Sequence, residues 1–286
     1  MPSTRDAALP ALFVVLWSTG FIFARLGLAY AQPFTFLAVR LAVAAALLLA
    51  IAVASGAAWP RTTREGGHIA VTGLLFHGAY LVGVFEALAH GVATGIVALI
   101  AGLQPILTAA VAGPLLGERI NRRQWAGFVL GFAGVALVVW DRFGAREGTP
   151  EGFALAGLCL VGITAGTLYQ KRFCPNLDPR SGTAIQFAAA ATVLTVFSLV
   201  FETGHIVWSR EFIVAFSWLT LVLSVGTFNL LVLLIRRGAA SRVSSLFYLV
   251  PPVTALIGWL GFGEVLGPVA LAGMGVAVAG VALVNR

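Results

Sequence analysis

The stretch AGLQPILTAAVAGPLLGERINRRQWAGFVLGFAGVALV at Ala101–Val138 is matched 146 residues later by FYLVPPVTALIGWLGFGEVLGPVALAGMGVAVAGVALV at Phe247–Val284. Without a gap, 14 of the 38 aligned positions are identical. An apolar composition produces scattered Ala and Leu matches, but it does not reproduce a proline, a Gly-Glu pair and two later glycines at the same separations. These matches are Pro105 with Pro251, Gly117-Glu118 with Gly263-Glu264, Gly127 with Gly273, and Gly134–Val138 with Gly280–Val284. The chain therefore contains an internal duplication.

The composition is that of a membrane protein. Hydrophobic residues make up 59% of the 286 residues, charged residues only 10%, and the mean hydropathy is +0.97. Soluble proteins carry about 25% charged residues, so a cytosolic enzyme, a nucleic-acid-binding protein and a secreted disulfide scaffold are excluded. The net charge of +7 reflects Lys and Arg in cytoplasmic loops. Cys159 and Cys174 lack the spacing of metal ligands, and we expect them to be unpaired.

Apolar runs of membrane-spanning length predict an all-α integral membrane protein with ten transmembrane helices. The predicted spans are 8–28, 34–55, 67–88, 92–113, 124–140, 152–170, 181–201, 212–235, 240–262 and 268–284. No connecting segment is long enough to form a separate soluble domain. One transmembrane bundle is therefore expected to make up the whole protein.

The loop charges predict the orientation of these spans. With the N-terminus inside, thirteen Lys and Arg fall on the cytoplasmic side and four on the other, so both termini are predicted to be cytoplasmic and the protein to lie in the cell inner membrane. Ala29-Tyr30-Ala31 could mark a signal-peptide cleavage site. However, the same offset of 146 residues pairs Gly20 with Gly166 and Pro33 with Pro179, so the first span corresponds to the sixth and is expected to be retained.

Five spans in each half is an odd number, so the second half must enter the membrane from the opposite side. We therefore expect two inverted five-helix repeats, at 1–146 and 147–286. The small-residue stripes in the last helix of each half should allow close packing between helices or between subunits. These stripes are Gly127, Gly131 and Gly134, and Gly273, Ala277 and Gly280.

Each of the two predicted repeats contains a proline, then a Gly-Glu pair, then a glycine-rich last helix. This order of features in ten helices resembles the drug/metabolite transporter superfamily, and within it the EamA-domain exporters. The matching residues are Leu103-Gln104-Pro105, Leu116–Arg119, Gln124–Gly127 and Gly134-Val135, then Val250–Pro252, Gly263-Glu264, Gly273 and Gly280. The opening Leu16–Phe21, with mid-span His77 and Tyr80, looks most like the YddG-type amino-acid exporters. The resemblance implies export of amino acids, aromatic ones included, or of similar small metabolites.

Two pairs of residues are the first candidates for a substrate site. His77 lies mid-span, and Tyr80 shares its helix face three residues later; the alternative for His77 is a structural hydrogen bond to a neighbouring backbone carbonyl. Trp17 is also mid-span, three residues before Gly20. Tryptophan usually lies at membrane interfaces, so Trp17 either lines a substrate path or packs against lipid or a neighbouring helix.

Prolines at equivalent places in the two halves predict helix kinks that shape a central path, with plain packing kinks as the alternative. They are Pro105, Pro251 and Pro252. Gln104, Tyr248 and Asn229 could line this path.

Ionisable residues inside spans are functional candidates because they are costly in a bilayer. Arg40 could anchor at the interface, contact an anionic or carboxylate group, or form an ion pair. Glu86 lies near the outer end of its span, where an ion pair with Arg25 could close an outer gate; a solvated rim carboxylate is the alternative.

These features favour a transporter that works by alternating access, with an amino acid as substrate and the bilayer as its environment. No carboxylate lies near mid-membrane, so we expect facilitated uniport, with a proton-linked exporter of drugs or other metabolites as the alternative. An intramembrane enzyme is remote, because no paired acids or metal-ligand cluster occur at depth. We expect no cofactor, metal or nucleic acid, and a monomer or homodimer.

Overall fold

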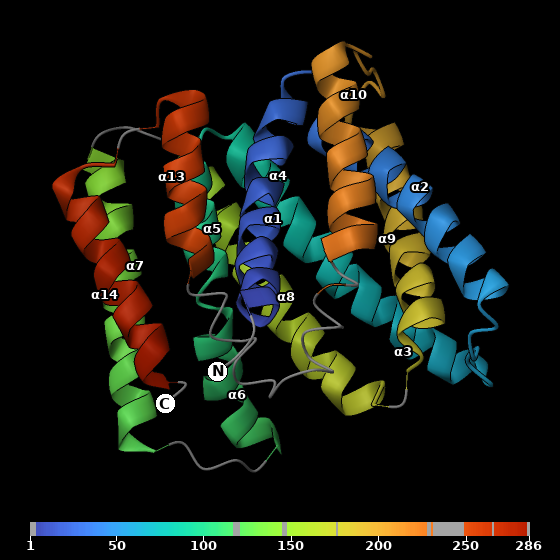
Figure 1. The fold of residues 1–286 in the computed structure, drawn as a ribbon, viewed down its shortest axis with the longest axis horizontal. Helices are drawn as coiled ribbons and strands as arrows, with labels where there is room; N and C mark the ends of the chain where they lie inside the picture. The colour runs from blue at the N-terminus through green and yellow to red at the C-terminus, as the bar shows by residue number, and fades with distance from the viewer. Residues whose placement is uncertain are drawn as a thin grey trace.

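The computed structural model describes residues 4–116, 121–144, 148–175, 177–227, 230, 249–264 and 266–284. These residues form a helical bundle, with one isolated antiparallel bridge between Ala31 and Ile206 (Figure 1). The helices are α1 Thr4–Leu28, α2 Pro33–Ala54, α3 Thr63–Gly73, η1 Leu74–Ala79, α4 Tyr80–Ala89, α5 Thr94–Ala101, α6 Gln104–Leu116, α7 Arg122–Gly144, α8 Pro150–Phe173, α9 Pro179–Phe201, α10 Arg210–Ser217, η2 Trp218–Thr227, α13 Val250–Phe262 and α14 Pro268–Val284. In Figure 1, α1 begins and α14 ends at the lower end of the bundle; α1 leads into α2 at the upper end.

Among the described residues, six helical stretches are long and apolar enough to cross a membrane. They are Leu9–Leu28, Pro33–Ala54, Thr63–Ala89, Pro150–Phe173, Pro179–Phe201 and Arg210–Thr227, and shorter apolar helices lie at Thr94–Thr108, Val250–Phe262 and Pro268–Gly280. Large apolar side chains on their outer surfaces, such as Leu199 at 77% exposure, face the region that lipid would occupy. The chain is a multi-pass helical membrane protein, while parts of the predicted spans 212–235 and 240–262 lie outside the described residues.

Helices from the two halves pack directly against each other. α2 lies along α9, α7 along α14, and α5 along α13. In addition, α4 packs on α8, and α1 packs on η2 and α10. The buried apolar core is therefore shared between the halves, as the adjacent placement of α7 and α14 and of α2 and α9 in Figure 1 shows.

At the upper end, a carboxylate from α9 covers the first turn of α2. Glu202 accepts hydrogen bonds from the backbone N of Phe34 (2.8 Å) and of Thr35 (2.6 Å), and from Thr35 Oγ1 (2.6 Å). In the other direction, Gln32 Oε1, just before α2, accepts a hydrogen bond from the backbone N of Thr203, just after α9, at 3.0 Å. An anion at a helix N-terminus satisfies unpaired N–H groups and complements the helix dipole, so this contact ties the two helices together.

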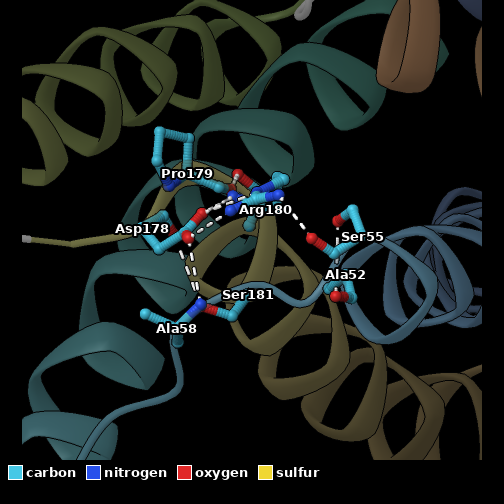
Figure 2. A network of polar contacts seen from close by, with 8 residues as sticks. Ala52, Ser55, Ala58, Asp178, Pro179, Arg180 and Ser181 are labelled. Carbon is cyan, nitrogen blue, oxygen red and sulfur yellow. Dashed lines mark hydrogen bonds and ion pairs between the residues drawn. The ribbon is translucent and has the colours of Figure 1, made fainter.

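At the lower end, Asp178 forms the corresponding tie (Figure 2). Its carboxylate accepts hydrogen bonds from the backbone N of Arg180 (3.0 Å), from Arg180 Nη2 (2.8 Å) and from the backbone N of Ala58 (3.0 Å). Arg180 Nη1 donates to the carbonyl of Ser55 at 3.0 Å, and Ser181 Oγ donates to the carbonyl of Ala58 at 2.5 Å. Asp178 therefore caps α9 and also holds the chain that leaves α2.

Replacing Asp178 by alanine is expected to lower the free energy of unfolding by about 1 kcal/mol, the usual cost of losing a helix N-cap. The Arg180 side chain and backbone hold the pKa of the Asp178 carboxyl below its usual range. A carboxyl with a depressed folded pKa stabilises the protein above its unfolded pKa of about 4 and loses this contribution as pH falls further. Thermal unfolding in detergent at pH 7 and pH 3 should therefore show a smaller pH effect for Asp178→Asn than for the parent chain. An unchanged pH effect would contradict this role for Asp178.

The small-residue stripes lie between α7 and α14 within one chain. A Cβ atom added at Gly134 would lie within 3 Å of the Ala277 backbone, and one added at Gly280 would lie 2.7 Å from the Gly127 carbonyl oxygen. The helix backbones thus approach too closely for larger side chains. The packing interpretation of these stripes is confirmed inside the chain.

The prolines that the sequence analysis placed at kinks lie in the first turns of helices. α5 ends at Ala101 and α6 begins at Gln104, so Pro105 follows a break rather than bending a continuous helix. Pro251 and Pro252 occupy the corresponding first turn of α13, which begins at Val250. Proline is tolerated in a first turn at little cost, because the N–H there is unpaired anyway. The predicted span 92–113 is thus interrupted just before Pro105, whereas residues 231–248 lie outside the described ones and the kink at Pro251 and Pro252 stays a prediction.

Candidate functional site

Two π-helical segments interrupt the third long helix of each half. The segment η1 covers Leu74–Ala79, and η2 covers Trp218–Thr227. Shifting η2 back by the 146-residue offset places it over residues 72–81, which contain η1. Such segments widen a helix locally and frequently occur at functional sites. Sequence reasoning missed them, because hydrophobic periodicity does not separate a short π segment from an α-helix.

His77 lies in η1, near the middle of the 27-residue apolar stretch Thr63–Ala89. Its ring centroid is 4.0 Å from that of Phe187, and the side chain of Gln186 lies within hydrogen-bonding reach. Gln186 is buried and its Nε2 donates to Gln170 Oε1 at 3.4 Å. His77 therefore interacts with side chains of α9 and, through Gln186, with α8.

Tyr80 begins α4 directly after η1 and is partly buried. A Cβ atom added at Gly162 of α8 would lie 2.6 Å from the Tyr80 backbone N. The glycine therefore lets α8 approach the backbone at the point where the π segment ends.

Arg40 brings a positive charge to the same region from α2. Its residue surface is only 5% exposed, and it lies close enough to His77 and Tyr80 to interact with both electrostatically. Its Nη2 donates to the Leu219 carbonyl (3.4 Å) and to Ser224 Oγ (3.5 Å), both in η2. The interface-anchor prediction for Arg40 is wrong, because the side chain points into the bundle and contacts a helix of the other half. A charged side chain at this depth costs about 2.5 kcal/mol or more.

The segment of α1 that contains Trp17 and Gly20 packs toward η2. A Cβ atom at Gly20 would lie 2.6 Å from Leu223 Cδ2, so this glycine permits close helix contact. Trp218 Nε1 donates to Thr19 Oγ1 at 2.9 Å. Trp17 is partly buried, and its ring centroid is 5.4 Å from that of Phe13.

Gln104, the first residue of α6, contacts α8. Its Nε2 is 3.2 Å from Thr108 Oγ1 and 3.2 Å from Thr167 Oγ1, so it joins α6 to α8. Asn229 and Tyr248, the other two predicted lining residues, lie outside the described residues.

Arg25 pairs with Glu264, and the predicted Arg25–Glu86 ion pair is wrong. α13 ends at Phe262, and the next residue, Gly263, has a φ of 66°, a left-handed conformation that glycine adopts easily. This turn places Glu264 beside Arg25, where the two side chains form an ion pair. Glu86 instead faces His90, with 3.8 Å between Oε2 and Nδ1.

Glu264 also reaches the first turn of α5. Its carboxylate accepts from the Thr94 backbone N at 3.1 Å and from Thr94 Oγ1 at 2.8 Å. The guanidinium of Arg25 lies 4.7 Å from the ring centroid of Phe262. We call Arg25, Thr94 and Glu264 the upper clamp, because together they join α1, α5 and α13 at the upper end of the bundle.

Sequence reasoning did not single out Gln186, Ser224 or Trp218. Gln186 carries a signal that could have been used, since an amide in the apolar stretch Pro179–Phe201 must find a partner in the bundle. Ser224 and Trp218 carry no comparable signal, because serine and tryptophan are common in membrane helices. Their role depends on the path of η2, which the sequence does not reveal.

The fold and this cluster define a class: a multi-pass membrane protein that gathers polar side chains from both halves of the chain within its apolar bundle. The model of the EamA-like transporter family matches residues 7–140 and again 151–286. The chain therefore belongs to the EamA-like transporter family, in the drug/metabolite transporter superfamily.

Relatives and a solved structure agree with this assignment. The chain is 30% identical to a probable terminal-alkyne amino-acid exporter of Streptantibioticus cattleyicolor, over 96% of this chain and 91% of that protein. It is 25% identical to a probable amino-acid metabolite efflux pump of Salmonella typhimurium, over 97% and 94% of the two chains. One crystal structure is similar with a TM-score of 0.65 at 22% identity, covering 96% of this chain and 94% of that one, which shows the fold alone. The relatives are named as exporters and efflux pumps, not as enzymes.

Proposed function

We propose that this transporter exports amino acids, aromatic or neutral, and related small metabolites across the cell inner membrane. The observation that carries the proposal is the cluster of Arg40, His77, Tyr80 and Gln186 beside the two π segments. Hydrogen-bond donors and acceptors at this depth suit the polar ends of a small zwitterion. The names of the two relatives support the same substrate class.

The proposed mechanism is alternating access between two inverted repeats at 1–146 and 147–286, with both termini in the cytoplasm. The helix pairing supports it, because α2 with α9 and α7 with α14 each join elements that the 146-residue offset makes equivalent. The contact of η1 with α8 likewise corresponds to the contact of η2 with α1. Such an arrangement permits one half to rock against the other around a central site.

Facilitated uniport is the proposed mode of transport. The helical stretch that contains His77 carries one carboxylate after it, Glu86. This residue lies in the last turns of α4 and faces His90. A proton-coupled exporter usually keeps a carboxylate near mid-membrane. Proton-linked export of drugs or other metabolites is the second candidate, with His77 as the group that would carry the proton.

The decisive experiment is counterflow in liposomes that contain the purified protein. The liposomes are loaded with one unlabelled amino acid at a time, and uptake of labelled phenylalanine or threonine is followed at equal pH on both sides. Accumulation of label above the level of protein-free liposomes is the expected result. If no amino acid produces counterflow, with or without a pH gradient, the proposed substrate class is wrong.

His77→Gln separates the two modes of transport. Glutamine keeps a neutral hydrogen-bonding side chain but cannot take up a proton near neutral pH. Under uniport, we expect His77→Gln to retain counterflow, with the same response to an imposed pH gradient as the parent chain. If the parent requires a pH gradient and His77→Gln loses the gradient-driven uptake, proton-linked export replaces uniport.

A further inference from the structure

Arg40 is a buried cation that the described structure leaves without an anionic partner. It lies seven residues after Pro33, about 10 Å along α2 from the upper end. Among the described residues, ion pairs form at Arg25, His90 and Arg180, but Arg40 takes part in none of these pairs. The guanidinium therefore carries its charge into the apolar bundle without the compensation that buried charges usually have.

The hydrogen bonds of Arg40 leave part of its binding capacity unused. Arginine has five N–H donors, and here the two bonds from Nη2 to Leu219 (3.4 Å) and Ser224 (3.5 Å) are longer than N–H···O hydrogen bonds usually are. The Nε atom is buried and has no hydrogen-bond partner. Nε and Nη2 are the donors that bind a carboxylate as a pair, so one edge of the guanidinium is incompletely used.

The groups that surround Arg40 are neutral or aromatic. Ser224 and Leu219 of η2 contact it, His77 and Tyr80 interact with it electrostatically, and the ring centroid of Phe85 lies 6.0 Å from its guanidinium carbon. An arginine kept only for packing would be expected to have all its donors satisfied by the protein. The buried Nε of Arg40 has no acceptor although hydrogen-bonding side chains surround it. This arrangement instead indicates a binding site for a ligand that supplies the missing acceptor.

We infer that Arg40 binds the carboxylate of the transported molecule, which makes a carboxylate a requirement for recognition. The inference rests on the proposed function, because it assigns one contact within the same site. The planar guanidinium donates hydrogen bonds to both carboxylate oxygens. The carboxylate of the ligand also supplies the negative charge that no described residue places beside Arg40. An amine of the same shape without the carboxylate would leave Arg40 uncompensated and would add a second positive charge.

The test compares two competitors that differ in this group. Counterflow of labelled phenylalanine is measured with rising concentrations of unlabelled phenylalanine or of 2-phenylethylamine, which has the same ring and amine but no carboxylate. For the parent chain, we expect at least a tenfold weaker competition by 2-phenylethylamine. Equal competition by the two compounds would overturn the inference while leaving the proposed function intact.

Variants at Arg40 connect this preference to the residue. Arg40→Gln should raise the KM for phenylalanine at least tenfold and bring the competition ratio of the two compounds close to one. Arg40→Lys keeps the charge without the two-pronged geometry and should fall between. Arg61→Gln, which alters an exposed arginine in the loop after α2, is the matched control and should leave both values unchanged.

Each remaining outcome decides the question. If Arg40→Gln or Arg40→Lys retains the parent's preference for phenylalanine, Arg40 has a structural role only and the inference is wrong. If Arg40→Gln does not fold, Arg40→Lys and the competitor comparison in the parent chain still supply the answer. If the parent chain transports no amino acid at all, the proposed function fails and the inference fails with it.

Discussion

Replacing Gly280 by leucine is expected to lower the stability of the protein by about 1–3 kcal/mol or more, because overpacking a tight interface forces backbone shifts. A Cβ at this position would already lie 2.7 Å from the Gly127 carbonyl oxygen and 2.8 Å from the Gly131 Cα. These are backbone atoms, so no side-chain rotation can relieve the clash. Thermal unfolding in detergent, followed by circular dichroism, measures the effect.

Gly275 provides the matched control in the same helix. A Cβ added there has no neighbour within 4 Å, so Gly275→Leu introduces the same side chain without a clash. We expect its unfolding temperature to remain close to that of the parent chain. Equal destabilisation by the two substitutions would contradict close packing between α7 and α14.

The helices and their glycine contacts could be predicted from the sequence with simple physical rules. A run of apolar residues in a bilayer must be helical, because only a helix satisfies its own backbone N–H and C=O groups. Gly134 and Gly280 then mark a close approach, since two helices can meet so tightly only where side chains are absent. Both the helices and the close contacts at these glycines are found in the structure.

The pairing of the charged residues could not be predicted in this way. Glu86 and Glu264 are both carboxylates near the upper end of the bundle, and the sequence does not say which of them Arg25 meets. That choice depends on the turn at Gly263, which places Glu264 between Arg25 and the first turn of α5. The inward direction of Arg40 has the same origin, because it depends on the position of η2 in the other half.

The upper clamp should control access from the upper end, and Glu264→Gln is expected to loosen it. The substitution removes the charge that pairs with Arg25 and that strengthens the hydrogen bonds from Thr94. Hydrogen bonds to a charged group contribute about 1.5–3 kcal/mol each, while half-exposed ion pairs such as that of Arg25 add less. Since about 1.4 kcal/mol corresponds to a tenfold change in an equilibrium, the upper end should open at least tenfold more often.

Chemical labelling of a single cysteine at position 18 can measure this opening. Ser18 is fully buried in α1, about 15 Å below Leu28, and its Oγ lies 3.4 Å from the Val250 carbonyl at the start of α13. When α1 and α13 separate at the upper end, this position becomes reachable. We expect a membrane-impermeant maleimide added outside cells to label Ser18→Cys about tenfold faster when Glu264→Gln is present, in a chain with Cys159→Ala and Cys174→Ser.

Arg180→Gln provides the control, because it breaks an ion pair of similar kind at the lower end of the bundle. In the proposed orientation the lower end faces the cytoplasm, so loosening it should not speed labelling from outside. If Arg180→Gln accelerates labelling as much as Glu264→Gln does, the substitutions merely loosen the whole bundle. If Glu264→Gln leaves the labelling rate unchanged, the contact among α1, α5 and α13 does not limit access. Faster labelling with Glu264→Gln alone would identify the upper clamp as the barrier that a substrate must pass on its way out.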